Sequence, residues 1–140
     1  MKIKAVEIQG VIAGISEMSE IKLPGKLVYW LARTAKQLIS EAQTLEETRV
    51  KLLEEHAEKD DNGKPVILYD KDDEGKDIKE RGTYDLADEE AYGAAWKAVL
   101  EAEIEITMDA LKPTVFDELE EKGIDIPTGA VYKLLPLFEE

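Results

Sequence analysis

The longest regular pattern in the chain is a stripe of apolar residues between residues 24 and 58. Its members recur at alternating steps of four and three, the period of one face of an α-helix. Pro24 suits a first helical turn because that position needs no amide hydrogen bond, and Asp60-Asp61-Asn62-Gly63 supplies residues that end helices. We therefore predict one long helix, with a seam formed by Leu31, Ala35, Leu38, Ala42, Leu45, Arg49, Leu52 and His56.

Two segments far apart in the chain have the two-residue period of a β-strand. Charged residues alternate with apolar ones over residues 2–8 and again over residues 103–107. We expect these segments to pair into a small antiparallel sheet. Between the first strand and the long helix, residues 9–21 are expected to form a short helix, although Gly10 and Gly14 weaken its intrinsic propensity.

Residues 60–85 combine turn sequences with many charges and few candidates for a core. Asn62-Gly63 and Glu74-Gly75 flank a short apolar run, which predicts a hairpin or a mobile excursion. Asp85 or Asp88 is expected to cap a second long helix, because acidic residues follow in its first turn. The inner face of that helix is predicted to be Tyr92, Ala95, Trp96, Val99 and Leu100.

The C-terminal part of the chain predicts two short helices. The first covers residues 113–122 and is closed by Gly123, and the second covers residues 128–138, with Thr128 as its cap and Pro136 breaking its last turn. Together these patterns predict a single domain over residues 1–140. Its class is α+β but mainly α, with two long antiparallel helices, a small antiparallel sheet and short C-terminal helices.

Composition supports a folded core and narrows the classes of partner. Hydrophobic residues make up 44% of the chain, and its net charge is −14. Such an acidic chain repels phosphate backbones, so direct nucleic-acid binding is not expected. Cysteine is absent, which excludes disulfides and thiolate metal sites. No apolar run is long enough to span a membrane, and the first ten residues do not have the pattern of a signal peptide.

The residues do not form a recognisable catalytic motif. The single histidine, His56, lies on the helical seam, where a packing role is expected. Ser16, Ser19 and Ser40 stand in no nucleophile motif, and the Gly-Lys pairs lack the spacing of a phosphate loop. We therefore expect a protein that is not an enzyme and that has no cofactor.

Two acidic turns resemble the first half of a calcium-binding loop, in which carboxylates alternate before a glycine. One begins at Asp70 and the other at Glu58. The acid that would close each site is missing, because Arg81 and Tyr69 occupy those positions. The sequence therefore favours solvated acidic turns over a metal site.

The most informative charge pattern lies at the start of the long helix. Between residues 21 and 40 the chain has four basic residues and no acid, although a helix dipole favours acids at this end. Two interpretations stay open. These cations either face acidic helices of the same chain, or they form a partner surface with neighbouring aromatic residues, which interfaces favour as anchors. The candidate surface consists of Lys22, Lys26, Tyr29, Trp30, Arg33 and Lys36.

The segment Leu23-Pro24-Gly25-Lys26-Leu27-Val28-Tyr29-Trp30-Leu31-Ala32-Arg33 resembles the start of small proteins from phages and prophages of Gram-positive and related bacteria, the DUF1617-like family of unknown function. The resemblance continues through residues 41–53 and "EKDDNGK", and it resumes in "LEAEIEI". Trp30 and the longer section over residues 113–130 depart from the family pattern. Such proteins are typically encoded among virion structural and assembly genes, so the resemblance implies an interaction role and no catalytic residues.

These observations predict a viral accessory or virion-assembly protein that acts through protein–protein contacts. Its expected partners are viral structural proteins or further copies of itself, as a homo-oligomer, in the host cytoplasm or in the virion. The alternative is an acidic mimic of nucleic acid that inhibits a host nucleic-acid-binding protein. Rows of exposed carboxylates would support that alternative.

Overall fold

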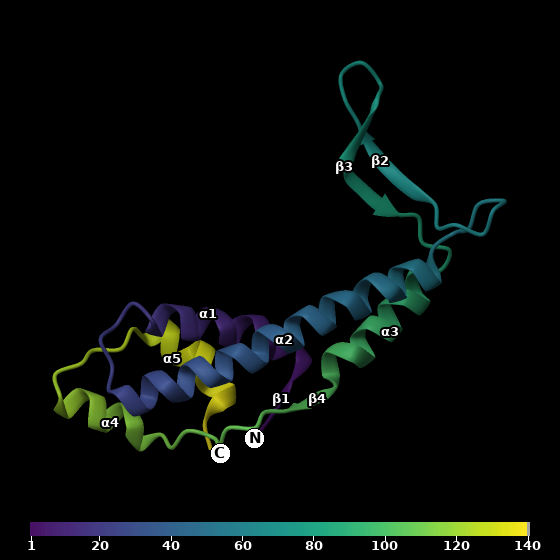
Figure 1. The fold of residues 1–140 in the computed structure, drawn as a ribbon. Helices are drawn as coiled ribbons and strands as arrows, with labels where there is room; N and C mark the ends of the chain where they lie inside the picture. The colour runs from purple at the N-terminus through teal and green to yellow at the C-terminus, as the bar shows by residue number, and fades with distance from the viewer. Residues whose placement is uncertain (140) are drawn as a thin grey trace. The chain divides into compact units, whose positions relative to one another are not determined.

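The computed structural model describes residues 1–139, in which the chain forms two compact units. The first unit contains residues 1–45 and the chain from Leu100 onward, and the second contains Glu46–Val99. Within the described residues, helices predominate and the strands form two two-stranded antiparallel sheets (Figure 1). This is the mainly helical α+β class that the sequence predicted. The expectation of a single domain stays a prediction.

The long helix α2 (Gly25–His56) matches the helix predicted over residues 24–58 to within two residues at each end. The carbonyl of Pro24 accepts hydrogen bonds from the N–H groups of Leu27 and Val28, both at 3.0 Å, so Pro24 occupies the cap position. The predicted seam is buried or half-buried, and Leu27 and Thr34 are buried beside it. None of the helices within residues 1–139 is long and apolar enough to cross a membrane.

The small sheet of the first unit joins the two strands that were predicted to pair. β1 (Lys2–Lys4) lies antiparallel to β4 (Glu103–Glu105), with Ile3 opposite Ile104. The predicted strand over residues 2–8 is wrong after Lys4, where the chain enters the 3-10 helix η1 (Ala5–Glu7). The reason is that the partner strand is short. Helix α3 occupies the chain up to Glu101, so β4 begins only at Glu103, which lies opposite Lys4.

The core of the first unit lies among α1 (Ile8–Met18), α5 (Thr128–Leu134) and the first part of α2 (Figure 1). Gly14 allows α1 and α5 to approach closely, since a Cβ at this position would lie only 2.9 Å from the Cβ of Lys133. The fully buried side chains include Ile8, Val11, Met18, Leu38, Ile106, Leu119, Leu134 and Leu137. Burial of each large aliphatic side chain contributes about 1.5–3 kcal/mol.

Two of the predicted helix ends are confirmed. Asp88 caps α3 (Glu89–Glu101), since its Oδ1 accepts a hydrogen bond from the N–H of Ala91 at 3.0 Å. After α4 (Thr114–Glu121), Gly123 has φ +75° and donates its N–H to the carbonyl of Glu120 at 2.9 Å. A glycine is favoured there because other residues rarely adopt this left-handed conformation.

The predicted cap of α5 is wrong. Pro127 occupies the cap position, and its carbonyl accepts the N–H groups of Ala130 and Val131 at 3.0 and 3.2 Å. Thr128 is therefore the first helical residue, and its side chain makes no capping hydrogen bond. Pro136 ends the regular helix as predicted, because proline has no N–H to donate to the preceding turn. The chain continues as the 3-10 helix η2 (Leu135–Leu137).

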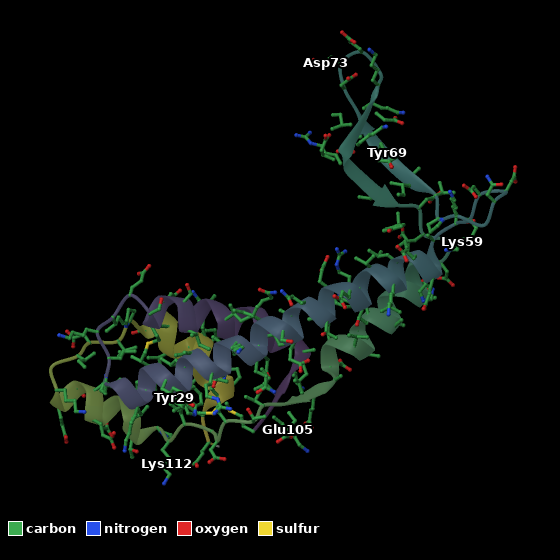
Figure 2. All side chains as sticks on the ribbon, in the orientation of Figure 1. Tyr29, Lys59, Tyr69, Asp73, Glu105 and Lys112 are labelled. Carbon is green, nitrogen blue, oxygen red and sulfur yellow. The ribbon has the colours of Figure 1, made fainter. Side chains whose placement is uncertain are left out.

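The second unit contains the predicted hairpin, formed by β2 (Ile67–Lys71) and β3 (Asp77–Tyr84). Asp73 lies at its tip (Figure 2). Asp72 shapes the turn by accepting hydrogen bonds from the N–H groups of Glu74 and Lys76, and Gly75 takes a positive φ of +78°. The turn at Asp60, Asn62, Gly63 and Lys64 repeats this arrangement.

In helix α3 the predicted inner face is the half-buried one, and none of its residues is fully buried. The inner residues Tyr92, Ala95, Trp96, Val99 and Leu100 are half-buried. Tyr92 meets the ring of His56 edge-on, with ring centroids 6.4 Å apart, and the carbonyl of His56 accepts the N–H of Ala87 at 2.8 Å. His56 therefore has the predicted packing role at the end of α2.

Candidate protein-binding surface

The predicted surface residues lie at the start of α2 and just before it. Steps of three and four residues place Lys26, Tyr29, Arg33 and Lys36 along one side of the helix, and all four side chains are exposed. Tyr29 retains 60% of its accessible surface. Lys22 is also exposed but precedes the helix. We call these five residues the basic surface.

The cations of the basic surface have no acidic partner within the described chain. None of the ion pairs within residues 1–139 involves Lys22, Lys26, Arg33 or Lys36. Arg33 instead donates a hydrogen bond to the hydroxyl of Tyr29 at 3.2 Å, with its guanidinium 5.8 Å from the ring centroid. Among the described residues these cations therefore form no ion pair with an acidic helix, although Lys26 and Glu118 of α4 line the same pocket, and all four side chains are exposed to solvent.

Trp30 differs from the other predicted surface residues. Its side chain is half-buried against the core of the first unit, and its indole N–H donates to the carbonyl of Asp109 at 3.0 Å. This hydrogen bond attaches the extended segment after β4 to α2. Trp30 is therefore held in place beside the basic surface and is not an exposed anchor.

A second attachment lies two turns further along α2. Gln37 donates from Nε2 to the carbonyl of Glu105 at 2.8 Å, and its Oε1 accepts both the N–H and the hydroxyl of Thr107, at 3.0 and 3.1 Å. In Figure 2, Tyr29 marks α2, and Glu105 and Lys112 mark the segment that these bonds hold beside the helix. Residues 105–111 therefore form a wall along one side of α2.

This arrangement creates two neighbouring concavities in the first unit. The first has a volume of about 330 Å³ and lies between the start of α2 and α4. Its lining is mainly apolar, and it is formed by Pro24, Leu27, Trp30, Leu111, Val115 and Leu119 together with Lys26, Glu118 and Lys122. The second, of about 610 Å³, is more open and polar, and it is lined by Tyr29, Arg33, Lys36, Gln37, Ser40 and Thr107.

The structure thus combines the predicted residues with others that the sequence did not reveal. Gln37 was within reach of sequence reasoning, because it lies one turn after Arg33 on the same side of α2. Leu111 and Val115 were not, because they come from a segment about eighty residues later in the chain. Lys22 lines neither concavity.

The three serines considered for catalysis take part in local hydrogen bonds, Ser19 through its hydroxyl and Ser16 and Ser40 through their backbone carbonyls. The hydroxyl of Ser19 donates to the carbonyl of Ser16 at 2.6 Å, and Ser40 accepts a hydrogen bond from Thr44 through its carbonyl. Among the residues that the structure describes, no group of three or more histidine or acidic side chains is arranged to hold a metal ion.

Comparisons with protein-family models, with curated proteins and with solved structures find no match to this chain. The resemblance to the DUF1617-like phage proteins stays a prediction from sequence.

Proposed function

We propose that this protein is a viral accessory or virion-assembly protein that acts through protein–protein contacts and has no catalytic activity. The observation that carries the proposal is the basic surface, where four exposed cations have no acidic partner among residues 1–139, in a chain of net charge −14. Early cations are unfavourable for the dipole of α2, so helix stability does not explain them. A partner that supplies negative charge does.

The resemblance to phage proteins supports the viral part of the proposal, and it favours the host cytoplasm or the virion as the location. The expected partners are viral structural proteins or further copies of this chain. Tyr and Arg support a protein interface because they are enriched among residues that dominate binding energy. Direct binding to nucleic acid or to a membrane is not part of this function.

The test is genetic complementation in a bacterium whose phage carries the gene. Deletion of the gene should reduce the yield of infectious particles and leave incomplete particles visible by electron microscopy. The wild-type gene should restore the yield, whereas a Lys26→Glu/Arg33→Glu variant should not. A Lys79→Glu/Arg81→Glu variant is the matched control, because it makes the same charge change at two exposed residues of the hairpin.

The unfolding temperature of the variants and the identity of the recovered partner complete the test. Neither variant should unfold at a lower temperature than the wild type, since all four substituted side chains are exposed and an acid at position 26 suits the dipole of α2. Normal particle yield and morphology after deletion would overturn the assembly role. A pulldown from infected cells identifies the partner. If it recovers only a host nucleic-acid-binding protein, and if that binding is lost in moderate salt, the acidic-mimic alternative is established instead.

A further inference from the structure

The two concavities include the neighbouring residues Tyr29 and Trp30 of α2 and differ in chemistry, and we call them together the strip. The polar groove contributes two cations, Arg33 and Lys36, whereas the apolar pocket is walled by Leu27, Trp30 and Val115. The adjacent residues Tyr29 and Trp30 belong to the groove and the pocket respectively. A ligand that lies along the helix therefore meets positive charge and an apolar depression in succession.

The pocket has the size and lining to accept a single apolar side chain. Its volume of about 330 Å³ is at the lower end of ordinary ligand sites. The indole N–H of Trp30 is already bonded to the backbone of Asp109, so the ring contributes an apolar surface held in place. Two lysines and one glutamate also line the pocket, which leaves this end of the strip with a net positive charge as well.

The groove is suited to carboxylates. Arg33 is held over Tyr29 by a hydrogen bond to the tyrosine hydroxyl, and a guanidinium binds planar carboxylates through paired N–H groups. Neither Arg33 nor Lys36 forms an ion pair within residues 1–139. A carboxylate ligand therefore has no intramolecular acid to displace.

We propose that this strip binds an extended, acidic segment of another protein that carries one apolar anchor. The spacing follows from the helix. Lys26 of the pocket and Arg33 of the groove lie two turns apart on the same side of α2, or roughly 10 Å along the axis. An extended strand covers that distance in about three residues. The recognised pattern is thus an aliphatic or aromatic residue with one or two carboxylates about three positions away.

This inference rests on the proposed function and specifies the partner of the same surface. Charge selects the occupant, because the strip is positive while the chain as a whole is strongly negative. Net repulsion disfavours a second copy as the occupant. Self-association through the strip is therefore an outcome that the experiment must distinguish.

The experiment measures binding of the full-length protein to fluorescein-labelled peptides of about ten residues by fluorescence anisotropy. The reference peptide has one phenylalanine and two aspartates, the nearer of which is three positions from the phenylalanine. Its other residues are serine and alanine. Its controls are a peptide without phenylalanine, a peptide with lysines in place of aspartates, and a peptide with the aspartates next to the phenylalanine. The reference is expected to bind at least about tenfold more tightly than each control, and less tightly as salt is raised.

Variants identify the two ends of the strip. Arg33→Glu/Lys36→Glu should weaken binding of the reference peptide at least about tenfold, whereas Lys79→Glu/Arg81→Glu should leave it unchanged. Val115→Phe should remove the preference for the phenylalanine anchor by filling the pocket. Circular dichroism melting checks the fold of each variant. If Val115→Phe fails to fold, the peptide without phenylalanine still tests the anchor.

Three results would overturn the proposal. One is equal binding of the reference and control peptides. The second is binding that Arg33→Glu/Lys36→Glu does not weaken. The third is a dimer, seen by sedimentation, that dissociates in this variant and so assigns the strip to a second copy. The proposed viral function is judged separately, because peptide binding with normal particle yield after gene deletion would reject that function and keep this site.

Discussion

Alanine substitutions at Gly10 and Gly14, one turn apart on α1, are expected to have different effects on stability. Apart from its chain neighbours and the backbone of its own helix, no described heavy atom lies within 4 Å of the Cβ position at Gly10. At Gly14, a Cβ would lie 2.9 Å from Lys133 Cβ and 3.0 Å from Leu134 Cδ2. The Lys133 atom is attached directly to the backbone of α5, so it cannot move away without shifting that helix.

The magnitudes follow from two opposing terms. Replacing glycine by alanine in a helix stabilises by about 0.5–1 kcal/mol, and this gain applies at both positions. Overpacking a close contact costs about 1–3 kcal/mol, and this cost applies only at Gly14. We therefore expect Gly10→Ala to raise the free energy of unfolding. Gly14→Ala should have a value about 1–3 kcal/mol below that of Gly10→Ala.

Urea unfolding measures this difference. The chain has two tryptophans, Trp30 in the first unit and Trp96 in the second, so a Trp96→Phe background makes fluorescence report on the unit that contains α1. Gly93→Ala on α3 is a further control, because its Cβ position is also open. Equal unfolding free energies for Gly10→Ala and Gly14→Ala would refute the close approach of α1 and α5.

Three further predictions concern single contacts. The buried hydroxyl of Thr34 has no hydrogen-bond partner within the described residues, so Thr34→Val should raise the free energy of unfolding by about 1 kcal/mol in urea titrations, and a decrease would contradict this. At Gly82, a Cβ would lie 2.7 Å from Tyr69 Cε1, so Gly82→Ala should displace the ring and accelerate amide exchange in β2 and β3. Hydrogen bonds from Arg49 lower the pKa of Glu46 below its ordinary 4.5. The stabilisation is present above that pH and is lost as pH falls through the lowered pKa, and an NMR titration of Arg49→Gln should show the ordinary pKa restored.

The sequence determined the elements whose signals are local. The alternation of charged and apolar residues predicted strands at residues 2–4 and 103–105, and the Glu74-Gly75 turn predicted the hairpin. The start and end of α2 and its apolar face also followed from residue type and spacing. These features depend on backbone conformation and on a period of two or 3.6, which neighbouring residues encode directly.

Part of the candidate surface also followed from a local signal in the sequence. Lys26, Arg33 and Lys36 share one side of α2 because of their spacing along the helix, so the sequence predicted a basic strip. It also suggested Trp30 as an exposed anchor, but the structure places its indole against Asp109. A side chain that suits both an interface and a core cannot be assigned from its own neighbours in the chain.

The tertiary structure alone decided which segments lie beside that helix. Residues 105–122 provide one wall of the groove and most of the apolar pocket, although they are about eighty residues away in sequence. Their position follows from burial of side chains such as Leu119 and from hydrogen bonds by Gln37 and Trp30. A concave site needs surfaces from distant segments, and apolar burial between such segments is not directional, so the sequence pattern specifies that a face is covered but not what covers it.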